Sequence, residues 1–207
     1  MIKRLTFVED FRCFKQDESI DFHSGVNLLV GDQGVGKSTI FQCLAAVAGT
    51  KSKAITRGTK DKVKVDVEGG QYDVLALDFE KDSRRTQGYF DDSNAGFNFQ
   101  VITMFKSHGE STKYLLEVLS TKKGTIFLID EPDMALSIRS IKQLAHDLKI
   151  AAENGCQLIV AVHNPFLILS FEEVLDVAKR QFVDSGDFVR ELWGDSIEIL
   201  AKWHVHQ

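Results

Sequence analysis

The sequence predicts an α/β domain in which helices flank a mixed, mainly parallel β-sheet. Two short, mainly apolar runs, at residues 125–129 and 157–162, are typical of parallel strands that are buried on both faces. Between these runs, apolar residues recur at helical spacing over residues 137–153, and Asn154 and Gly155 end the pattern. A strand, a helix and a second strand in this order indicate a parallel sheet.

The N-terminal part carries further strand patterns. Residues 2–8 alternate between apolar and polar side chains, and residues 19–22 form a second short run before a turn, so we expect antiparallel strands at the start of the domain. The apolar run at residues 26–30 predicts a buried strand, and a helix is expected over residues 37–48.

The middle of the chain contains a hairpin pattern followed by a polar region. Residues 63–67 and 72–78 alternate in the manner of strands, and the glycine-bearing turn between them predicts a β-hairpin. Residues 80–99 are polar and are interpreted as a loop. Apolar residues then recur at helical spacing over residues 110–120.

Composition restricts the class of protein. With 207 residues and 43% apolar side chains, the chain is large enough for one domain over residues 1–207 with a full core. It has no run of about 18 apolar residues, and its first residues alternate like a strand, so we expect a cytoplasmic protein that does not contact the membrane. Cys13, Cys43 and Cys156 are far apart and have no nearby cysteine or histidine, which favours buried, reduced thiols over a zinc site.

The net charge of −5 argues against a protein that coats polyanions with its whole surface. Residues 51–64 form one local basic segment. A solvated loop and strand face is the simpler interpretation of this segment. If DNA binds directly, the first candidate contacts are the basic side chains Lys53, Arg57, Lys60 and Lys62.

A glycine-rich loop after the strand at residues 26–30 is the strongest functional signal. The run G-D-Q-G-V-G-K-S-T at residues 31–39 matches the pattern of a phosphate-binding loop. In such a loop the glycines let backbone N–H groups surround a phosphate, Lys37 reaches the β and γ oxygens, and the Ser38 hydroxyl binds Mg²⁺. The predicted nucleotide contacts are Gln33, Gly34, Val35, Gly36, Lys37, Ser38 and Thr39.

A second signal follows the buried strand at residues 125–129. Asp130 stands at the end of this strand, where a carboxylate can hold Mg²⁺, and Glu131 is placed to act as general base toward an attacking water. His163 follows the next strand and should emerge at the same edge of the sheet, where a neutral imidazole could contact the γ-phosphate. The motifs therefore favour hydrolysis of a nucleotide, with Lys37, Glu131 and His163 as catalytic candidates and Ser38 and Asp130 as metal ligands.

The order of these motifs resembles the ABC-class P-loop ATPases, in particular the soluble branch that includes SMC proteins, RecF and OLD-type ATPases. Residues 11–14 (Phe-Arg-Cys-Phe) look like the element that precedes the phosphate loop in that branch, and the resemblance implies that Arg12 lies near the nucleotide phosphates. Residues 130–137 resemble the Walker B motif and the D-loop that follows it. His163 is similar to the switch histidine. The resemblance implies ATP and Mg²⁺ as ligands.

Residues 107–111 (Ser-His-Gly-Glu-Ser) are similar to an abbreviated form of the family's signature loop, carried by a reduced helical lobe at about residues 80–122. Glycine before a helical run would leave N–H groups free to bind an anion. In the family this anion is the γ-phosphate held by the opposite subunit. The resemblance therefore implies an ATP-sandwiched homodimer in which Ser107 and Gly109 act in trans.

The chain departs from the family in three respects. About seventy residues separate Lys37 from Ser107, which is too few for the coiled-coil arms of SMC proteins. The part after His163 is expected to leave no room for an OLD-type nuclease domain. The metal-sensing glutamine is not placed, because Gln71 and Gln87 both compete for that role.

These observations predict an ATPase that dimerises around Mg-ATP and transmits the change to DNA or to a partner protein, in repair, recombination or genome defence. An ATP-sensing regulatory subunit of an effector or nuclease complex is an alternative that the sequence does not separate from it. The signature-like loop and the element at residues 11–14 count against a transporter subunit. The acid pair with His163 fits water activation better than a small-molecule kinase.

The C-terminal aromatic and histidine residues carry no assigned function. Trp193 and Trp203 are interpreted as residues that close a core or a helix interface. His204 and His206 form a His-x-His pair, but we expect the chain end to be disordered and to bind no metal.

Overall fold

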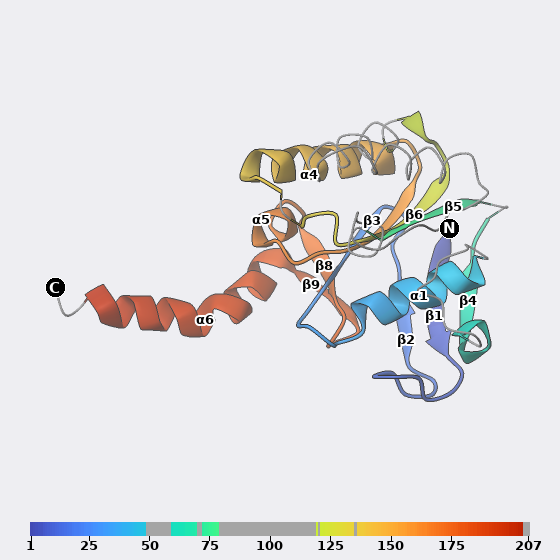
Figure 1. The fold of residues 1–207 in the computed structure, drawn as a ribbon, viewed down its shortest axis with the longest axis horizontal. Coiled ribbons are helices and arrows are strands. Elements are labelled where there is room, and N and C mark those ends of the chain that lie inside the picture. The colour runs from blue at the N-terminus through green and yellow to red at the C-terminus, as the bar shows by residue number, and fades with distance from the viewer. Residues whose placement is uncertain (49–58, 70–71, 79–118, 120, 135, 205–207) are drawn as a thin grey trace, which may run out of the picture.

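A six-stranded sheet forms the centre of the fold (Figure 1). The computed structural model describes residues 1–48, 59–69, 72–78, 119, 121–134 and 136–204. In their order across the sheet, the strands are β5 (Asp73–Asp78), β6 (Thr125–Asp130), β7 (Gln157–Ala161), β3 (Val26–Val30), β8 (Glu173–Asp176) and β9 (Gln181–Asp184). The first five are parallel to their neighbours, and β9 is antiparallel to β8. The predicted mixed, mainly parallel sheet is confirmed.

A second sheet of three strands is antiparallel throughout and consists of β2 (Ser19–Asp21), β1 (Ile2–Phe7) and β4 (Val63–Val67). The predicted antiparallel strands at the N-terminus are therefore confirmed. The predicted hairpin between residues 63–67 and 72–78 is wrong, because β4 pairs with β1 whereas β5 pairs with β6 of the large sheet. Burial decides this pairing over the local turn pattern, since Val63 packs in one core with Leu5 and Phe7.

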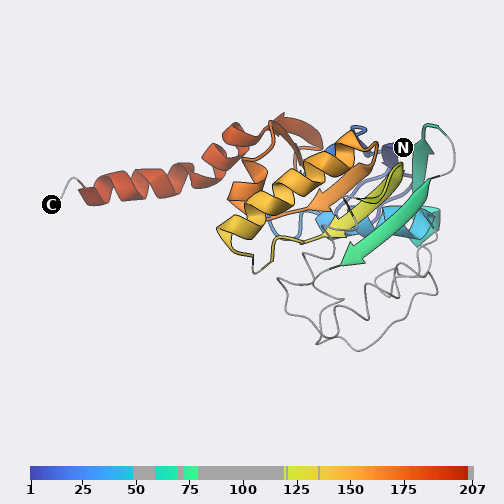
Figure 2. The same ribbon diagram turned by 90° about the horizontal axis from the view of Figure 1, so that it is seen from above.

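Helices cover both faces of the large sheet (Figures 1 and 2). The helix α1 (Lys37–Val47) packs on the face that the small sheet also covers, and α4 (Ile138–Glu153) packs on the opposite face. Side chains of β6 alternate between these layers, because Phe127 packs with residues of α4 and Leu128 with residues of α1. This two-sided burial explains why β6 and β7 are apolar runs without alternation.

Truncation of Phe127 tests the packing of the layer beneath α4. Its ring is fully buried, and its removal leaves a cavity that the neighbouring side chains fill only in part. We expect Phe127→Ala to lower the free energy of unfolding by about 3–5 kcal/mol, as measured by urea denaturation. Ile138→Ala is the control, because Ile138 is 56% exposed and its truncation should change this free energy by about 0.5 kcal/mol or less. Equal stability of the two variants would contradict the described core.

The part of the chain after β7 contains elements that the sequence patterns did not predict. These are the short helix α5 (Pro165–Ile168), the hairpin of β8 and β9, and the helix α6 (Ser185–His204), which projects from the body of the molecule (Figures 1 and 2). His204 is the last residue of α6, so the expectation of disorder is wrong for this residue, and His206 lies outside the described residues. Among the helices that the structure describes, none is long and apolar enough to cross a membrane.

The three cysteines differ in environment. Cys43 and Cys156 are buried, but Cys13 is exposed, so the expectation of a buried thiol is wrong for Cys13. Burial raises the pKa of Cys43 to about 12, which keeps this thiol protonated and unreactive. The thiol of Cys13 lies 3.4 Å from the carbonyl oxygen of Val35 in the glycine loop.

Candidate functional site

The carboxyl ends of the parallel strands bring the sequence motifs to one edge of the large sheet. There β3 continues into the glycine loop, β6 ends at Asp130, and β7 ends two residues before His163. The N–H of Glu131 donates to the carbonyl oxygen of Ala161 at 3.0 Å, which joins the ends of β6 and β7. The structure thus places His163 at the same edge as the acid pair, where ligands of open α/β sheets bind.

The glycine loop presents backbone N–H groups at the start of α1. Gly31, Gly34 and Gly36 have φ angles of 129°, 85° and 111°, in the left-handed region that glycine tolerates best. The helix α1 begins directly after Gly36 with no side-chain cap and no acidic residue in its first turn. Its first N–H groups are therefore available to an anion, and the helix dipole favours negative charge there. These residues fit a phosphate group.

Gly36→Ala tests this loop. A Cβ atom at Gly36 would lie 2.5 Å from Cε2 of Phe14 and 2.7 Å from Sγ of Cys13, at a φ that L-residues rarely adopt. We expect ATP binding to weaken at least about tenfold, because the loop must shift away from the phosphate-binding conformation. Gly155→Ala is the control, since Gly155 has a φ of 80° with no atom within 4 Å of its Cβ position. Titration calorimetry with an ATP analogue measures both affinities, and an unchanged affinity of Gly36→Ala would contradict the assigned loop.

Lys37 lies between the glycine loop and the acidic strand end. Its side chain is 6% exposed, and its ammonium donates to the carbonyl oxygens of Gly31 at 2.6 Å and Asp32 at 3.1 Å. Burial lowers the pKa of Lys37, and this effect is opposed by the nearby carboxylates, of which Glu131 and Asp130 act most strongly. The acidic residues at the end of β6 therefore favour the charged form of the ammonium.

Arg12 reaches the first turn of α1 from the loop after β1. Its Nη1 donates to Oγ1 of Thr39 at 3.2 Å, and its backbone has a φ of 56°. The loop is anchored by Phe14, whose ring is stacked on that of Phe7 with centroids 4.1 Å apart. This places a second positive charge beside the glycine loop, in the region that the family resemblance implies.

Glu131 and His163 face each other at the mouth of the site. The Nε2 atom of His163 lies 3.0 Å from Oε1 of Glu131. The side chain of His163 is 47% exposed and that of Glu131 is 24% exposed, so water can reach both. Glu131 also has a φ of 53°, an unusual conformation for a residue with a side chain and one that occurs at catalytic sites. A carboxylate and an imidazole in hydrogen-bond reach can together orient and deprotonate a water molecule.

Ser38 and Asp130 are the residues that could hold a divalent cation. Ser38 is half-buried in the first turn of α1, and Asp130 is buried at the end of β6. Hydroxyl and carboxylate oxygens suit Mg²⁺, which usually keeps waters and substrate phosphates as its other ligands. Within the described part of the chain, no group of three or more His, Cys, Asp or Glu residues could hold a metal alone. The residues present therefore fit Mg²⁺ bound jointly with a phosphate.

Several predicted residues lie outside the described part of the chain. Two of the basic candidates are described: Lys60 is exposed on the 3₁₀ helix η1 (Thr59–Lys62), and Lys62 forms an ion pair with Glu9. Part of the positive charge of this basic segment is therefore neutralised. The predicted residues that lie outside the described ranges are Ser107, Gly109, Gln71, Gln87, Lys53 and Arg57.

Asp133 belongs to the site but was not predicted. It is 6% exposed, and its Oδ2 accepts hydrogen bonds from the backbone N–H groups of His163 at 2.8 Å and Asn164 at 2.6 Å. An acidic residue after Asp-Glu-Pro is the only sequence signal for this contact. That signal does not indicate a partner thirty residues later.

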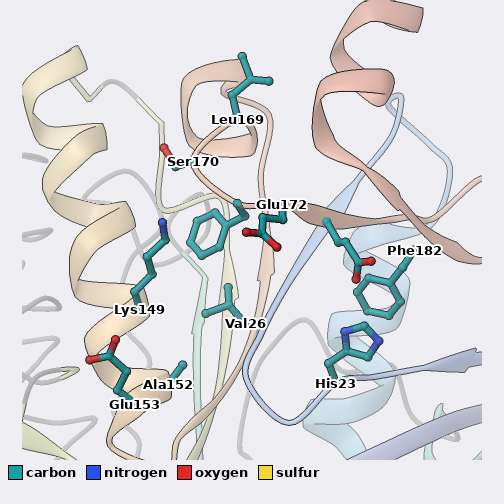
Figure 3. Close-up of a pocket in the computed structure, with 11 residues that line it drawn as sticks. His23, Val26, Lys149, Ala152, Glu153, Leu169, Ser170, Glu172 and Phe182 are labelled. Atoms are coloured by element: carbon teal, nitrogen blue, oxygen red, sulfur yellow. The ribbon is translucent and has the colours of Figure 1, made fainter.

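A separate hollow of about 680 Å³ lies near the opposite edge of the sheet (Figure 3). It is bordered by the end of α4, by Val26 at the start of β3, and by the segment before β8. His23 stacks on Phe182 with ring centroids 3.8 Å apart, and the ammonium of Lys149 lies 5.1 Å from the ring centroid of Phe171. Because this hollow is at the amino ends of the strands, it is not part of the glycine-loop site.

Comparisons with known proteins agree with this geometry. Residues 7–151 match the protein family described as AAA domain. The energy-dependent translational throttle protein EttA of Haemophilus influenzae is 27% identical over 198 residues, which cover 81% of this chain and 34% of that protein. The chain thus spans about a third of the length of this curated relative.

Solved structures of two kinds have a similar fold. The SMC head bound to the C-winged helix domain of ScpA aligns with a TM-score of 0.56 at 13% identity, covering 84% of this chain and 93% of that chain. An ABC transporter of the metal-chelate type in an inward-facing conformation aligns with a TM-score of 0.54 at 14% identity, covering 90% of this chain and 85% of that chain. The chain belongs to the AAA domain family, and it shares its fold with an ABC transporter ATPase and an SMC head.

Proposed function

We propose that this chain binds Mg-ATP at the glycine loop, hydrolyses it, and dimerises around it to drive a conformational change in a partner. One observation carries the proposal: the ammonium of Lys37 lies in the glycine loop, at the same edge of the sheet where the carboxylate of Glu131 is 3.0 Å from the imidazole of His163. A loop that binds phosphate would need only the first of these groups. The acid–imidazole pair adds the means to activate water.

The geometry supports in-line attack of water on the γ-phosphate. The oxygen of the water bonds to the γ-phosphorus while Glu131 accepts a proton from that water. The bond from the γ-phosphorus to the β–γ bridging oxygen breaks and leaves ADP and inorganic phosphate. Lys37 and the N–H groups of α1 stabilise the negative charge on the phosphate oxygens. Ser38 and Asp130 would hold Mg²⁺, which would neutralise negative charge on the phosphate oxygens.

The partial exposure of Glu131 and His163 supports a dimer. Within the described residues this side of the site is open to water, whereas a second chain would cover the γ-phosphate with Ser107 and Gly109, the residues that resemble the signature loop. A covered site strengthens every charge interaction within it, because the local dielectric constant falls. The structural similarity to SMC heads supports the same arrangement.

Light scattering of Glu131→Gln, with and without Mg-ATP, tests the dimer. Because this variant should retain ATP, we expect the monomer mass without nucleotide and twice that mass with Mg-ATP. Lys37→Ala treated in the same way is the control and should stay monomeric. A monomer under all conditions would contradict the sandwich.

For the partner, we favour DNA or a DNA-associated protein, in repair, recombination or genome defence. The similarity to SMC heads and the exposed Lys60 support this choice. A nucleotide-binding subunit of a transporter is the second candidate, because a transporter ATPase aligns with nearly the same TM-score. An ATP-sensing subunit of an effector complex is the third. Repeating the light scattering with duplex DNA tests whether DNA itself is the partner, since only a chain that binds DNA directly predicts a heavier complex.

A further inference from the structure

Asp133 connects the turn after β6 to the residues that follow β7. Its Oδ2 accepts the N–H groups of both His163 and Asn164, and the side chain is buried. Hydrogen bonds to a charged acceptor are about twice as strong as those between neutral groups. Two such bonds to adjacent amides fix the backbone at the point where the chain leaves the sheet.

This contact determines where the ring of His163 can lie. The side chain of His163 is 47% exposed, so packing contributes little to its position. Its Nε2 nevertheless lies 3.0 Å from Oε1 of Glu131. The backbone amide that Asp133 holds is therefore the main constraint that keeps the imidazole within reach of the carboxylate.

The same carboxylate orders the next turn of the chain. Asn164, whose N–H bonds to Asp133, caps α5 by accepting the N–H of Phe166 at 2.9 Å. The second oxygen of Asp133, Oδ1, is buried and has no hydrogen-bond partner among the described residues. An asparagine here could therefore keep the accepting oxygen in place with its amino group at the Oδ1 position.

We propose that Asp133 is a positioning residue for ATP hydrolysis: by accepting two backbone N–H groups, it holds His163 against Glu131. The inference rests on the proposed function, since it assigns Asp133 to the same reaction. Asp133 makes no proposed contact with the nucleotide or the water, and among the carboxylates that favour the charged form of Lys37 it has the smallest effect. Its loss should therefore lower the rate of the chemical step and leave nucleotide binding in place.

Steady-state kinetics of two variants test this role. We expect Asp133→Ala to lower kcat by about tenfold to a hundredfold, because a displacement of about 1 Å in a catalytic group has an effect of this size. KM for ATP should stay within about threefold, because the phosphate-binding loop is unchanged. Asp133→Asn, which keeps the accepting oxygen, should recover most of the kcat. If Asp133→Ala does not fold, Asp133→Leu takes its place in the comparison with Asp133→Asn, because leucine also removes the accepting oxygen.

Asp176→Ala is the matched control. Asp176 is also buried at the end of a parallel strand, and its Oδ1 accepts the N–H groups of Ala178 at 2.9 Å and Lys179 at 3.2 Å. Its truncation removes a comparable pair of bonds without touching the loop of His163. Its kcat should therefore stay within about threefold of the parent value.

Amide hydrogen exchange, followed by NMR, reports the contact without reference to activity. The amides of His163 and Asn164 should exchange faster in Asp133→Ala, remain protected in Asp133→Asn and stay unchanged in Asp176→Ala. A parental kcat in Asp133→Ala, an equal loss of kcat in Asp133→Asn, or a change confined to KM would overturn the inference. A parent protein without ATP hydrolysis would overturn the proposed function instead. If the parent protein does not hydrolyse ATP, amide exchange still tests the contact of Asp133. Unchanged exchange rates of the His163 and Asn164 amides in Asp133→Ala would show that Asp133 does not hold them.

Discussion

Glu131→Gln should bind Mg-ATP as the parent protein does and hydrolyse it at least about a hundredfold more slowly, since general bases contribute about 10²–10⁴-fold to rates. Glutamine has nearly the same shape as glutamate, so the left-handed backbone at this position and the contact of the side chain with His163 can persist. What the amide cannot do is take a proton from water. The expected defect therefore lies in kcat, with KM unchanged.

Phosphate release under steady-state conditions measures this loss, and Glu153→Gln provides the control. Glu153 is an exposed carboxylate at the end of α4, beside the hollow at the opposite edge of the sheet. Its substitution should leave kcat at the parent value. If Glu131→Gln hydrolysed ATP as fast as Glu153→Gln, Glu131 would not be the general base.

Lys37→Ala should lose nucleotide binding, with affinity for ATP at least about a hundredfold weaker, since a charge-assisted hydrogen bond in a desolvated site contributes about 3 kcal/mol or more. Lys37 is 6% exposed as a residue, and its ammonium bonds to the carbonyl oxygens of Gly31 and Asp32 in the glycine loop, where it can reach a bound phosphate. Lys37→Met, which keeps most of the side-chain volume, should show the same loss. The effect is therefore attributed to charge and not to packing.

The stability of the free protein distinguishes loss of a ligand contact from misfolding. Burial lowers the pKa of Lys37 despite the acidic neighbours, so the folded state gains little from this ammonium before nucleotide binds. We expect an unchanged Tm in Lys37→Met without ligand, together with loss of the Tm increase that Mg-ATP gives the parent protein. Lys142→Ala, on the exposed face of α4, should keep that increase. A parental Tm increase in Lys37→Met would place the nucleotide elsewhere.

The parts of the fold that could be predicted are those in which local sequence and burial agree. Residues 126–129 of β6 are all apolar because both faces of this strand are covered, and the position of His163 at the site follows from the order of strand, helix and strand. The partner of β4 could not be read from the turn after it, because its core contacts come from β1. The strands β8 and β9 were missed because each has four residues and begins or ends with a charged side chain.

The site itself was predictable where one motif carries one role. Lys37 follows from the glycine pattern and Glu131 from its place after a buried strand. The contact between Asp133 and the amide of His163 was not predictable from the sequence. It joins residues thirty positions apart, and its donor is a backbone N–H, which almost every residue carries. The helix α6 was missed because Gly186 and Gly194 interrupt a pattern in which Phe188 and Leu192 recur at helical spacing.

Phosphate release from Mg-ATP, measured over a wide range of protein concentration, tests the central claim most directly. We expect hydrolysis whose rate per chain rises with protein concentration and then reaches a plateau, because a second chain completes the site of Lys37, Glu131 and His163. Glu131→Gln should give no rise at any concentration. A rate per chain that does not depend on concentration, or no phosphate release by the parent protein at all, would contradict the account.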